Sequence, residues 1–318
     1  MIYAKDTSCA EPVLQTLAPG SFPNIISPAF TALRETVAAS RWVRALRDFS
    51  AELRGYDPLL YHLGWIQQAL IPMFAVMALL SAGHGVSPWI KPMKFATSFS
   101  TFLWTFAPML QALRVPEWQK TAARRATAFG VVFEMLFLSA QAWRGSFATG
   151  PATITDTIIL QGTSVMISVI TTVMLWLTVL YFTRRATADI GNRAMLIAVR
   201  FGLVIFMAGN AIGGYMLARG SHTVGAADGG PGLPFTNWST IAGDLRIAHF
   251  IAIHAIQILP LLAWLIGELR PSFRLNRQRI LVCAASCMLF IAVMGTFVQA
   301  SRGRPLVALF GTQQMAKK

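Results

Sequence analysis

Residues 157–182 read TIILQGTSVMISVITTVMLWLTVLYF, and this stretch decides the fold class. It contains no charged residue. At about 1.5 Å per residue, a helix of this length crosses a hydrocarbon core of about 30 Å. The segment therefore predicts a transmembrane helix. Similar runs recur along the chain, so we expect an all-α, polytopic membrane protein.

The composition of the whole chain agrees with this prediction. Of its 318 residues, 55% are hydrophobic and only 13% are charged. An average soluble domain has about 25% charged residues. The shortage of charge excludes a disordered chain, a collagen-like fibre and an ordinary water-soluble enzyme.

Seven runs have the length and apolar character of a membrane span, and we expect each to be a transmembrane helix. They cover residues 64–83, 95–114, 127–143, 157–182, 194–217, 246–267 and 280–300. The sequence thus predicts two regions. Residues 1–60 form an N-terminal region, and residues 61–318 form a seven-helix transmembrane bundle.

The N-terminal region has a pattern typical of a helix that lies in the membrane surface. Apolar residues recur at spacings of three and four, and arginines occupy positions between them. The apolar positions are Phe30, Leu33, Val37, Trp42, Leu46, Phe49 and Leu53, and the arginines are Arg34, Arg41, Arg44, Arg47 and Arg54. The pattern predicts an amphipathic interfacial helix. Packing of the same helix on the protein's own loops is the alternative.

The positive charge of the chain predicts its orientation. The chain has 27 Lys and Arg against 13 Asp and Glu, a formal net charge of +14. In a membrane protein, Lys and Arg collect in the cytoplasmic loops. The loops after the second, fourth and sixth spans hold eleven of these residues, and the alternate loops hold five. We therefore expect a bacterial inner-membrane protein with a cytoplasmic N-terminus, an outer C-terminus and no nucleic-acid partner.

Polar residues in the outer halves of the spans predict a pocket that opens outward. Cations near the span ends would form a rim that favours an anionic solute or a lipid headgroup. The predicted ligand-binding residues are His254, Gln257, Asn210, His249, Lys91, Lys94 and Arg246. This arrangement predicts a permease-like or ligand-binding protein. Alternatively, the rim cations only anchor the helices at the level of the lipid phosphates.

Three histidines near the outer surface give a second functional hypothesis. Loops can bring His84, His222 and His249 together, and imidazoles are common metal ligands. The protein would then be a membrane-embedded, metal-dependent enzyme, with Asp228 or Asp244 assisting. A third alternative is a structural subunit of a larger membrane complex, and an oligomer is compatible with each hypothesis.

The two histidines of the sixth span do not suit a shared metal or haem. His249 and His254 are five residues apart, which places their side chains about 140° apart around a helix. A metal site on one helix needs both imidazoles on one face. No second deep histidine opposes His254, so a bis-histidine haem is disfavoured.

Two charged residues fall in the inner halves of their spans. Glu134 and Arg200 are each about 10 Å deep, where an unpaired charge is costly. We therefore predict an ion pair between Glu134 and Arg200. The pair would fix the register of two helices, and a gating or proton-relay role is the alternative.

Three motifs carry a resemblance to other proteins. They are WIKPMKF at residues 89–95, GLPFTNWST at residues 232–240 and GDLRIAHF at residues 243–250. On these motifs the chain resembles uncharacterised bacterial multi-pass membrane proteins. The resemblance implies a multi-pass topology and an emphasis on the outer face, and it implies no activity.

Overall fold

The computed structural model describes residues 47–81, 87–145, 153–183, 192–270 and 272–307. The chain divides into two compact units, Met1–Glu52 and Leu53–Lys318. In the first unit, residues 47–52 are helical. Most of the predicted amphipathic helix between Phe30 and Leu53, residues 30–46, therefore lies outside the described residues.

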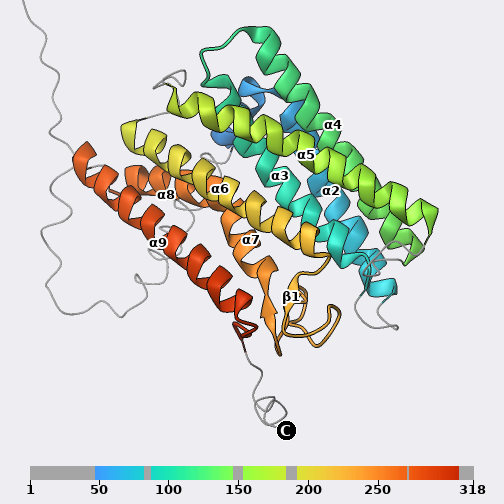
Figure 1. Ribbon diagram of the computed structural model, residues 1–318. Helices are drawn as coiled ribbons and strands as arrows, with labels where there is room; N and C mark the ends of the chain where they lie inside the picture. The colour runs from blue at the N-terminus through green and yellow to red at the C-terminus, as the bar shows by residue number, and fades with distance from the viewer. Residues whose placement is uncertain (1–46, 82–86, 146–152, 184–191, 271, 308–318) are drawn as a thin grey trace, which may run out of the picture. The chain divides into compact units, whose positions relative to one another are not determined.

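The second unit is an all-α helical bundle with one two-stranded sheet (Figure 1). Its helices are α2 (Pro58–Leu80), α3 (Ile90–Gln111), α4 (Glu117–Arg144), α5 (Ile154–Phe182), α6 (Arg193–Arg219), α7 (Leu245–Ile253), α8 (Ala255–Leu269) and α9 (Leu275–Ser301). Among the described helices, α2, α4, α5, α6 and α9 are each long and apolar enough to cross a membrane. Helices α7 and α8 are long and apolar enough only as a pair, bent by 46°, so the described helices provide five such segments, or six if this pair is one span. The chain is therefore a multi-pass membrane protein.

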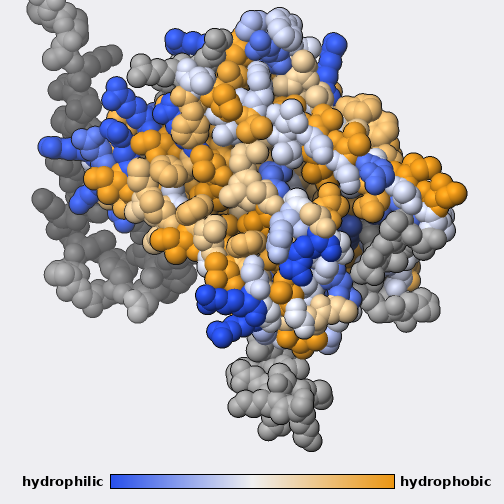
Figure 2. All heavy atoms as spheres, viewed as in Figure 1, coloured by the Kyte–Doolittle hydropathy of each residue, from blue (hydrophilic) through white to orange (hydrophobic). Residues whose placement is uncertain are grey.

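Large apolar side chains cover the outside of this bundle. Leu80, Ile154 and Ile291 are 79%, 81% and 68% exposed. On the face shown in Figure 2, apolar side chains cover the middle of the helices and hydrophilic ones gather toward the helix ends. Such a surface suits contact with lipid tails, which are as apolar as the side chains themselves.

Helix α3 carries a polar stripe that includes two lysines. The stripe consists of Lys91, Lys94, Ser98, Thr101 and Thr105, at alternating spacings of three and four residues. This spacing places all five residues along one side of the helix. With this stripe, α3 is not among the helices that are apolar enough to count as spans. The predicted span at residues 95–114 therefore remains a prediction.

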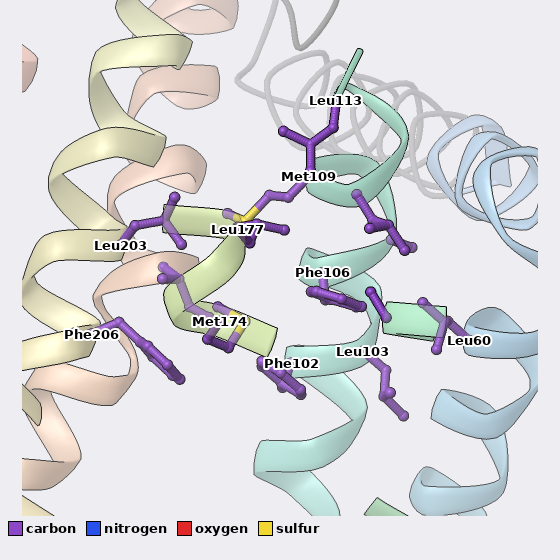
Figure 3. Close-up of a cluster of buried hydrophobic side chains, with 14 of the residues drawn as sticks. Leu60, Phe102, Leu103, Phe106, Met109, Leu113, Met174, Leu177, Leu203 and Phe206 are labelled. Atoms are coloured by element: carbon purple, nitrogen blue, oxygen red, sulfur yellow. The ribbon is translucent and has the colours of Figure 1, made fainter. Parts of the chain in front are cut away.

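The apolar core lies between α2, α3, α5 and α6. Figure 3 shows side chains from these four helices pointing toward one another. The buried set includes Leu60, Phe102, Leu103, Phe106, Met174, Leu177, Leu203 and Phe206. Phe102 stacks on Phe106 and on Phe206, with ring centroids 5.8 and 6.3 Å apart. Aromatic contacts thus join α3 to α6 at the centre of the bundle.

A small sheet closes one end of the bundle. Strands β1 (Thr223–Val224) and β2 (Gly243–Asp244) pair antiparallel. A Cβ atom on Gly243 would lie 2.0 Å from the carbonyl oxygen of Ala300, so only glycine allows β2 to approach the end of α9 this closely. We call this end, where α3 and α7 begin and α9 ends, the β end.

The opposite end of the bundle carries most of the arginines that the structure describes, and we call it the basic end. Here α2, α4, α6 and α9 begin. Its arginines include Arg114, Arg124, Arg125, Arg193, Arg274, Arg277 and Arg279. A buried ion pair joins two of these helix starts: Asp57 caps α2 by accepting the backbone N–H of Leu60 (3.1 Å) and pairs with Arg124 of α4. Sequence analysis missed this pair, although an Asp before Pro58 is a typical helix-start signal.

Candidate functional site

The loop between α6 and α7 is held by a carboxylate and a guanidinium. Asp244 caps α7 by accepting the backbone N–H groups of Arg246 (3.0 Å) and Ser239 (2.8 Å). The Arg246 side chain donates to both oxygens of Asp244, at 2.9 and 2.6 Å, and to the carbonyl oxygen of Asn237 at 2.5 Å. Arg246, a predicted rim cation, therefore has a structural role in this loop.

These contacts set the ionisation of Asp244. Burial alone would raise the pKa of Asp244, but the Arg246 guanidinium and the two backbone donors hold this pKa below its ordinary value. The carboxylate is therefore charged at neutral pH, and its partners neutralise it. This arrangement favours a loop anchor over a general acid or base.

His222 and Asp228 form a second contact in the same loop. The Nδ1 atom of His222 lies 3.3 Å from an oxygen of Asp228. Asp228 also accepts hydrogen bonds from Ser221 Oγ (3.0 Å) and from the backbone N–H groups of His222 (3.2 Å) and Thr223 (2.9 Å). Burial first, and then the charge of Arg246, lower the pKa of His222 below its usual value. The histidine is neutral at neutral pH and belongs to a hydrogen-bonded turn.

The predicted metal ligands have separate surroundings in the part of the chain that the structure describes. His222 lies in this turn, whereas the Nδ1 atom of His249 lies 2.7 Å from the carbonyl oxygen of Gly209 in α6. His84 lies outside the described residues. Within the described ranges, no three His, Cys, Asp or Glu side chains are grouped in a way that could hold a metal ion. The three-histidine site remains a prediction.

Glycines of α6 allow α7 and α8 to pack closely against it. A Cβ atom on Gly209 would lie 2.8 Å from Ala252 Cβ, and one on Gly213 would lie 2.9 Å from the His249 ring. A Cβ atom on Gly202 would lie 3.0 Å from the carbonyl oxygen of Ala255. The three glycines form one face of α6, and His249 fills a position on that face. This gives His249 a packing role between helices.

Asn210 joins two helices. Its Oδ1 accepts a hydrogen bond from Thr171 Oγ1 of α5 (3.0 Å), and its Nδ2 donates to the carbonyl oxygen of Phe206 in α6 (3.0 Å). Both ends of the amide are thus engaged at the contact of α5 and α6. Asn210, a predicted ligand-binding residue, therefore contacts Thr171 and Phe206, whereas His254 contacts Ser98 and Phe250.

His254 lies where α7 ends and α8 begins. We expected one continuous helix over residues 246–267, and the break at His254 corrects that expectation. The break precedes Pro260 by less than two turns, and proline bends helices because it lacks an N–H and its ring crowds the preceding turn. The Nε2 atom of His254 lies 3.4 Å from Ser98 Oγ of α3, and the ring packs edge-on against Phe250.

Gln257 lies one turn further along α8. Its Oε1 atom is buried without a well-formed hydrogen bond, and the side chain interacts with the His254 imidazole. We call Ser98, His254 and Gln257 the His254 cluster. It offers a hydroxyl, an imidazole and a buried amide oxygen between α3 and α8.

The polar stripe of α3 joins this cluster to the β end. Lys94 lies one turn before Ser98 on the same side of α3, and its Nζ donates to the carbonyl oxygen of Thr236 (3.3 Å). Lys91 lies a further turn toward the start of the helix and is exposed. The charges of Lys91, Lys94 and Arg246 act on one another. The structure therefore brings the three predicted rim cations together. Sequence analysis missed Ser98, although its spacing from the two lysines marks the stripe.

Glu134 and Arg200 have different neighbours, and the described residues contain no ion pair between them. Arg200 donates its Nε to the carbonyl oxygen of Tyr181, at 2.9 Å. The positive charge that acts on Glu134 is Lys91. The reason is the helix order: α4 packs on α2, α3 and α5, whereas α6 packs on α5 and on the helices from α7 to α9. The predicted pair relied on depth and did not account for this order.

Two surface hollows lie on other helices. One, of about 460 Å³, is lined by residues between Phe290 and Arg304 at the end of α9. The other, of about 450 Å³, lies along α5 and is lined by residues between Ser164 and Val173. Both are shallow and mainly apolar, so they suit lipid chains better than a polar solute.

Comparisons with protein-family models, with curated proteins and with solved structures found no match to this chain. The resemblance carried by the motifs at residues 89–95, 232–240 and 243–250 therefore remains a prediction.

Proposed function

We propose that the protein is a permease-like membrane protein that binds a small anionic solute or a lipid headgroup at the His254 cluster. In this proposal α3 is a seventh span. The β end faces the outside of a bacterial inner membrane, and the N-terminus is cytoplasmic. The observation that carries the proposal is the contact between Ser98 and His254 at the break of α7 and α8.

The break supports a binding site because the backbone of His254 leaves regular helical geometry there, with φ −86° and ψ −1°. Irregular backbone at membrane depth is tolerated where it is buried in protein or lines a cavity. Many transporters bind their substrates at such discontinuous helices. Here the break presents His254, and Gln257 adds, beside the imidazole, a buried acceptor without a well-formed hydrogen bond.

The lysines of α3 support an anionic ligand. Lys94 and Lys91 lie on the same side of the helix as Ser98, one and two turns nearer the β end, respectively. Their positive charges would raise the local concentration of an anion before it reaches the hydroxyl and imidazole groups. A free anion and the phosphate of a lipid share this chemistry, so the experiment must separate the two.

The orientation is supported by the basic end. Its arginines belong to helix starts and short connections, which is typical of the cytoplasmic side. The loop at the β end is longer and internally hydrogen-bonded. If α3 crosses the membrane, the seven crossings place the two chain ends on opposite sides.

Ligand-induced stabilisation of the purified full-length protein tests the proposal. Acetate, succinate, phosphate and sulfate would be added separately, with choline as a cationic control, and the thermal unfolding midpoint measured. A ligand at 100 times its Kd stabilises the folded state by about 2.7 kcal/mol. We expect an anion to raise the midpoint, and we expect His254→Gln to remove that increase. The matched variant His62→Gln should keep it, because His62 lies in the first turns of α2 at the basic end.

Native mass spectrometry separates the two sources of the anion. A bound anionic lipid that survives purification and is lost in His254→Gln would identify a headgroup as the ligand. The proposal is contradicted if no anion or anionic lipid binds, or if His254→Gln and His62→Gln bind equally well.

A further inference from the structure

Glu134 is a carboxylic acid in the interior of α4. Its residue is 1% exposed, and its Oε2 atom is buried without a hydrogen-bond partner. It lies ten residues before Arg144, which ends the helix, so it is about 15 Å from the β end of α4. An ionised Glu134 therefore needs a counter-charge from the helices around it.

Few charged groups lie on the helices that pack against α4. Helix α2 contains no Asp, Glu, Lys or Arg, and its histidine, His62, lies near the start of the helix at the basic end. The only Asp, Glu, Lys or Arg of α5 is Asp156, which is paired with Arg144 at 3.1 Å. Helix α3 contributes Lys91 and Lys94, and of these Lys91 is the charge that acts on Glu134. Lys91 is therefore the cation that can compensate an ionised Glu134.

Other buried carboxylates of the chain have a different environment. Asp57 and Asp244 are each 1% exposed, as Glu134 is. Each of them accepts a backbone N–H and pairs with an arginine. Glu134 has an oxygen that accepts no hydrogen bond, and ionisation of such a buried group is costly. Binding a proton removes that cost, since a neutral acid needs no counter-charge.

We propose that Glu134 is a reversible proton-binding site and that the position of the Lys91 charge controls its occupancy. When the lysine charge faces Glu134, the carboxylate is stabilised and the proton leaves. When the lysine charge is engaged at the β end, the carboxylate loses its counter-charge and binds a proton. Proton binding itself goes beyond the proposed ligand function. The link between proton uptake and anion binding rests on that function.

Labelling with dicyclohexylcarbodiimide tests the proton site in the full-length protein. The protonated carboxyl group adds across one C=N bond: the proton goes to a nitrogen and the carboxylate oxygen to the central carbon. The acyl group then moves to nitrogen and gives a stable N-acylurea, with no leaving group. Peptide mass spectrometry would locate the adduct. We expect labelling of Glu134 that increases as the pH falls, and none at Asp57 or Asp244.

Two lysine variants test the control by Lys91. In Lys91→Gln, labelling of Glu134 at neutral pH should rise several-fold because the counter-charge is gone. In Lys94→Gln, the matched control, the rise should be smaller. Glu134→Gln, which keeps the shape of the side chain, should lose the adduct, and size-exclusion chromatography would show that it is folded. The proton site is contradicted if Glu134 is labelled no more than Asp57 at any pH, and control by Lys91 is contradicted if both lysine variants label like the wild type.

Inorganic phosphate separates this inference from the proposed function. If phosphate engages Lys91, its addition should increase labelling of Glu134 in the wild type and have no effect in Lys91→Gln. A pH-dependent, Lys91-dependent adduct that phosphate does not change would support the proton site and contradict its link to oxyanion binding.

Discussion

The Nδ1 atom of His249 lies 2.7 Å from the carbonyl oxygen of Gly209, so an imidazole of α7 is fixed against the backbone of α6. The contact requires close packing of the two helices, and glycines of α6 make that packing feasible. It also fixes the half of the broken span that lies nearer the β end.

Substitution of Gly209 should reveal this packing. In Gly209→Ala the added Cβ would lie 2.8 Å from Ala252 Cβ and 3.0 Å from the backbone nitrogen of Ile253, so the helices must separate. Overpacking of this kind costs about 1–3 kcal/mol. We expect a lower thermal unfolding midpoint, measured by tryptophan fluorescence. Gly214→Ala is the control, because no atom lies within 4 Å of its Cβ position, and alanine favours a helix more than glycine does. Equal midpoints for the two variants would contradict the packing.

The ion pair between Asp244 and Arg246, which we call the clasp, should stabilise the loop between α6 and α7. Asp244→Asn leaves the guanidinium without its counter-charge, and breaking a buried ion pair costs about 3–5 kcal/mol. The Arg246 side chain is 28% exposed, so we expect the lower end of that range. The measurement is limited proteolysis of the β-end loop together with the unfolding midpoint. Lys94→Gln is the comparison variant, because Lys94 is a neighbouring cation that donates one hydrogen bond, to the carbonyl oxygen of Thr236. It should change the rate of proteolysis and the unfolding midpoint less than Asp244→Asn does.

The stability of the protein should decrease below about pH 6.5, and His222 should contribute to the decrease. Burial and the charge of Arg246 lower the folded-state pKa of His222, whereas the unfolded chain binds a proton at about pH 6.5. The unfolded state therefore binds more protons as the pH falls through this window, which favours unfolding. In His222→Gln the unfolding midpoint should depend less on pH between about 6.5 and 5. An identical pH dependence in wild type and variant would show that His222 does not contribute.

Two double-mutant cycles should distinguish the observed ion pair from the one expected from depth. Asp57→Asn and Arg124→Gln should show a coupling of about 0.5–3 kcal/mol, because the residues touch. Glu134→Gln and Arg200→Gln should be additive, because Arg200 donates to Tyr181 instead. A significant coupling in the second cycle would restore the original expectation.

A reporter fused after residue 318 should test the orientation. If the chain crosses the membrane seven times with its N-terminus in the cytoplasm, a phosphatase that is active only outside the cytoplasm will be active in this fusion. A fluorescent protein that folds only in the cytoplasm will be dark. The reverse pair of results would place the β end on the cytoplasmic side and contradict the proposed direction of ligand entry.

The apolar runs predicted most helices well because a long uncharged run leaves little choice of structure. The run at residues 157–182 became α5, which begins at Ile154 and ends at Phe182. The prediction for α4 was poorer at its start: the helix begins at Glu117, ten residues before residue 127, because its charged first turns extend beyond the apolar segment. Hydropathy finds the part of a helix that lies in lipid and does not find its full length.

The site was harder to predict because its contacts join distant parts of the chain. The position of His254 in its span indicated a functional residue, but the sequence could not show that Ser98 would face it or that the helix would break there. Asn210 and His249 were also predicted from their positions in their spans. Their partners, Thr171 and Gly209, depend on which faces of neighbouring helices meet, and depth alone carries no such information.

The bend of 46° between α7 and α8 divides residues 245–269 into two rods. The α7 rod is tied down twice, through His249 and through the clasp on Asp244. Helix α8 is held as well, because its first residues pack closely on Gly202 of α6. The break at His254 is therefore a fixed corner, with both arms anchored on α6 and the imidazole held 3.4 Å from Ser98 of α3.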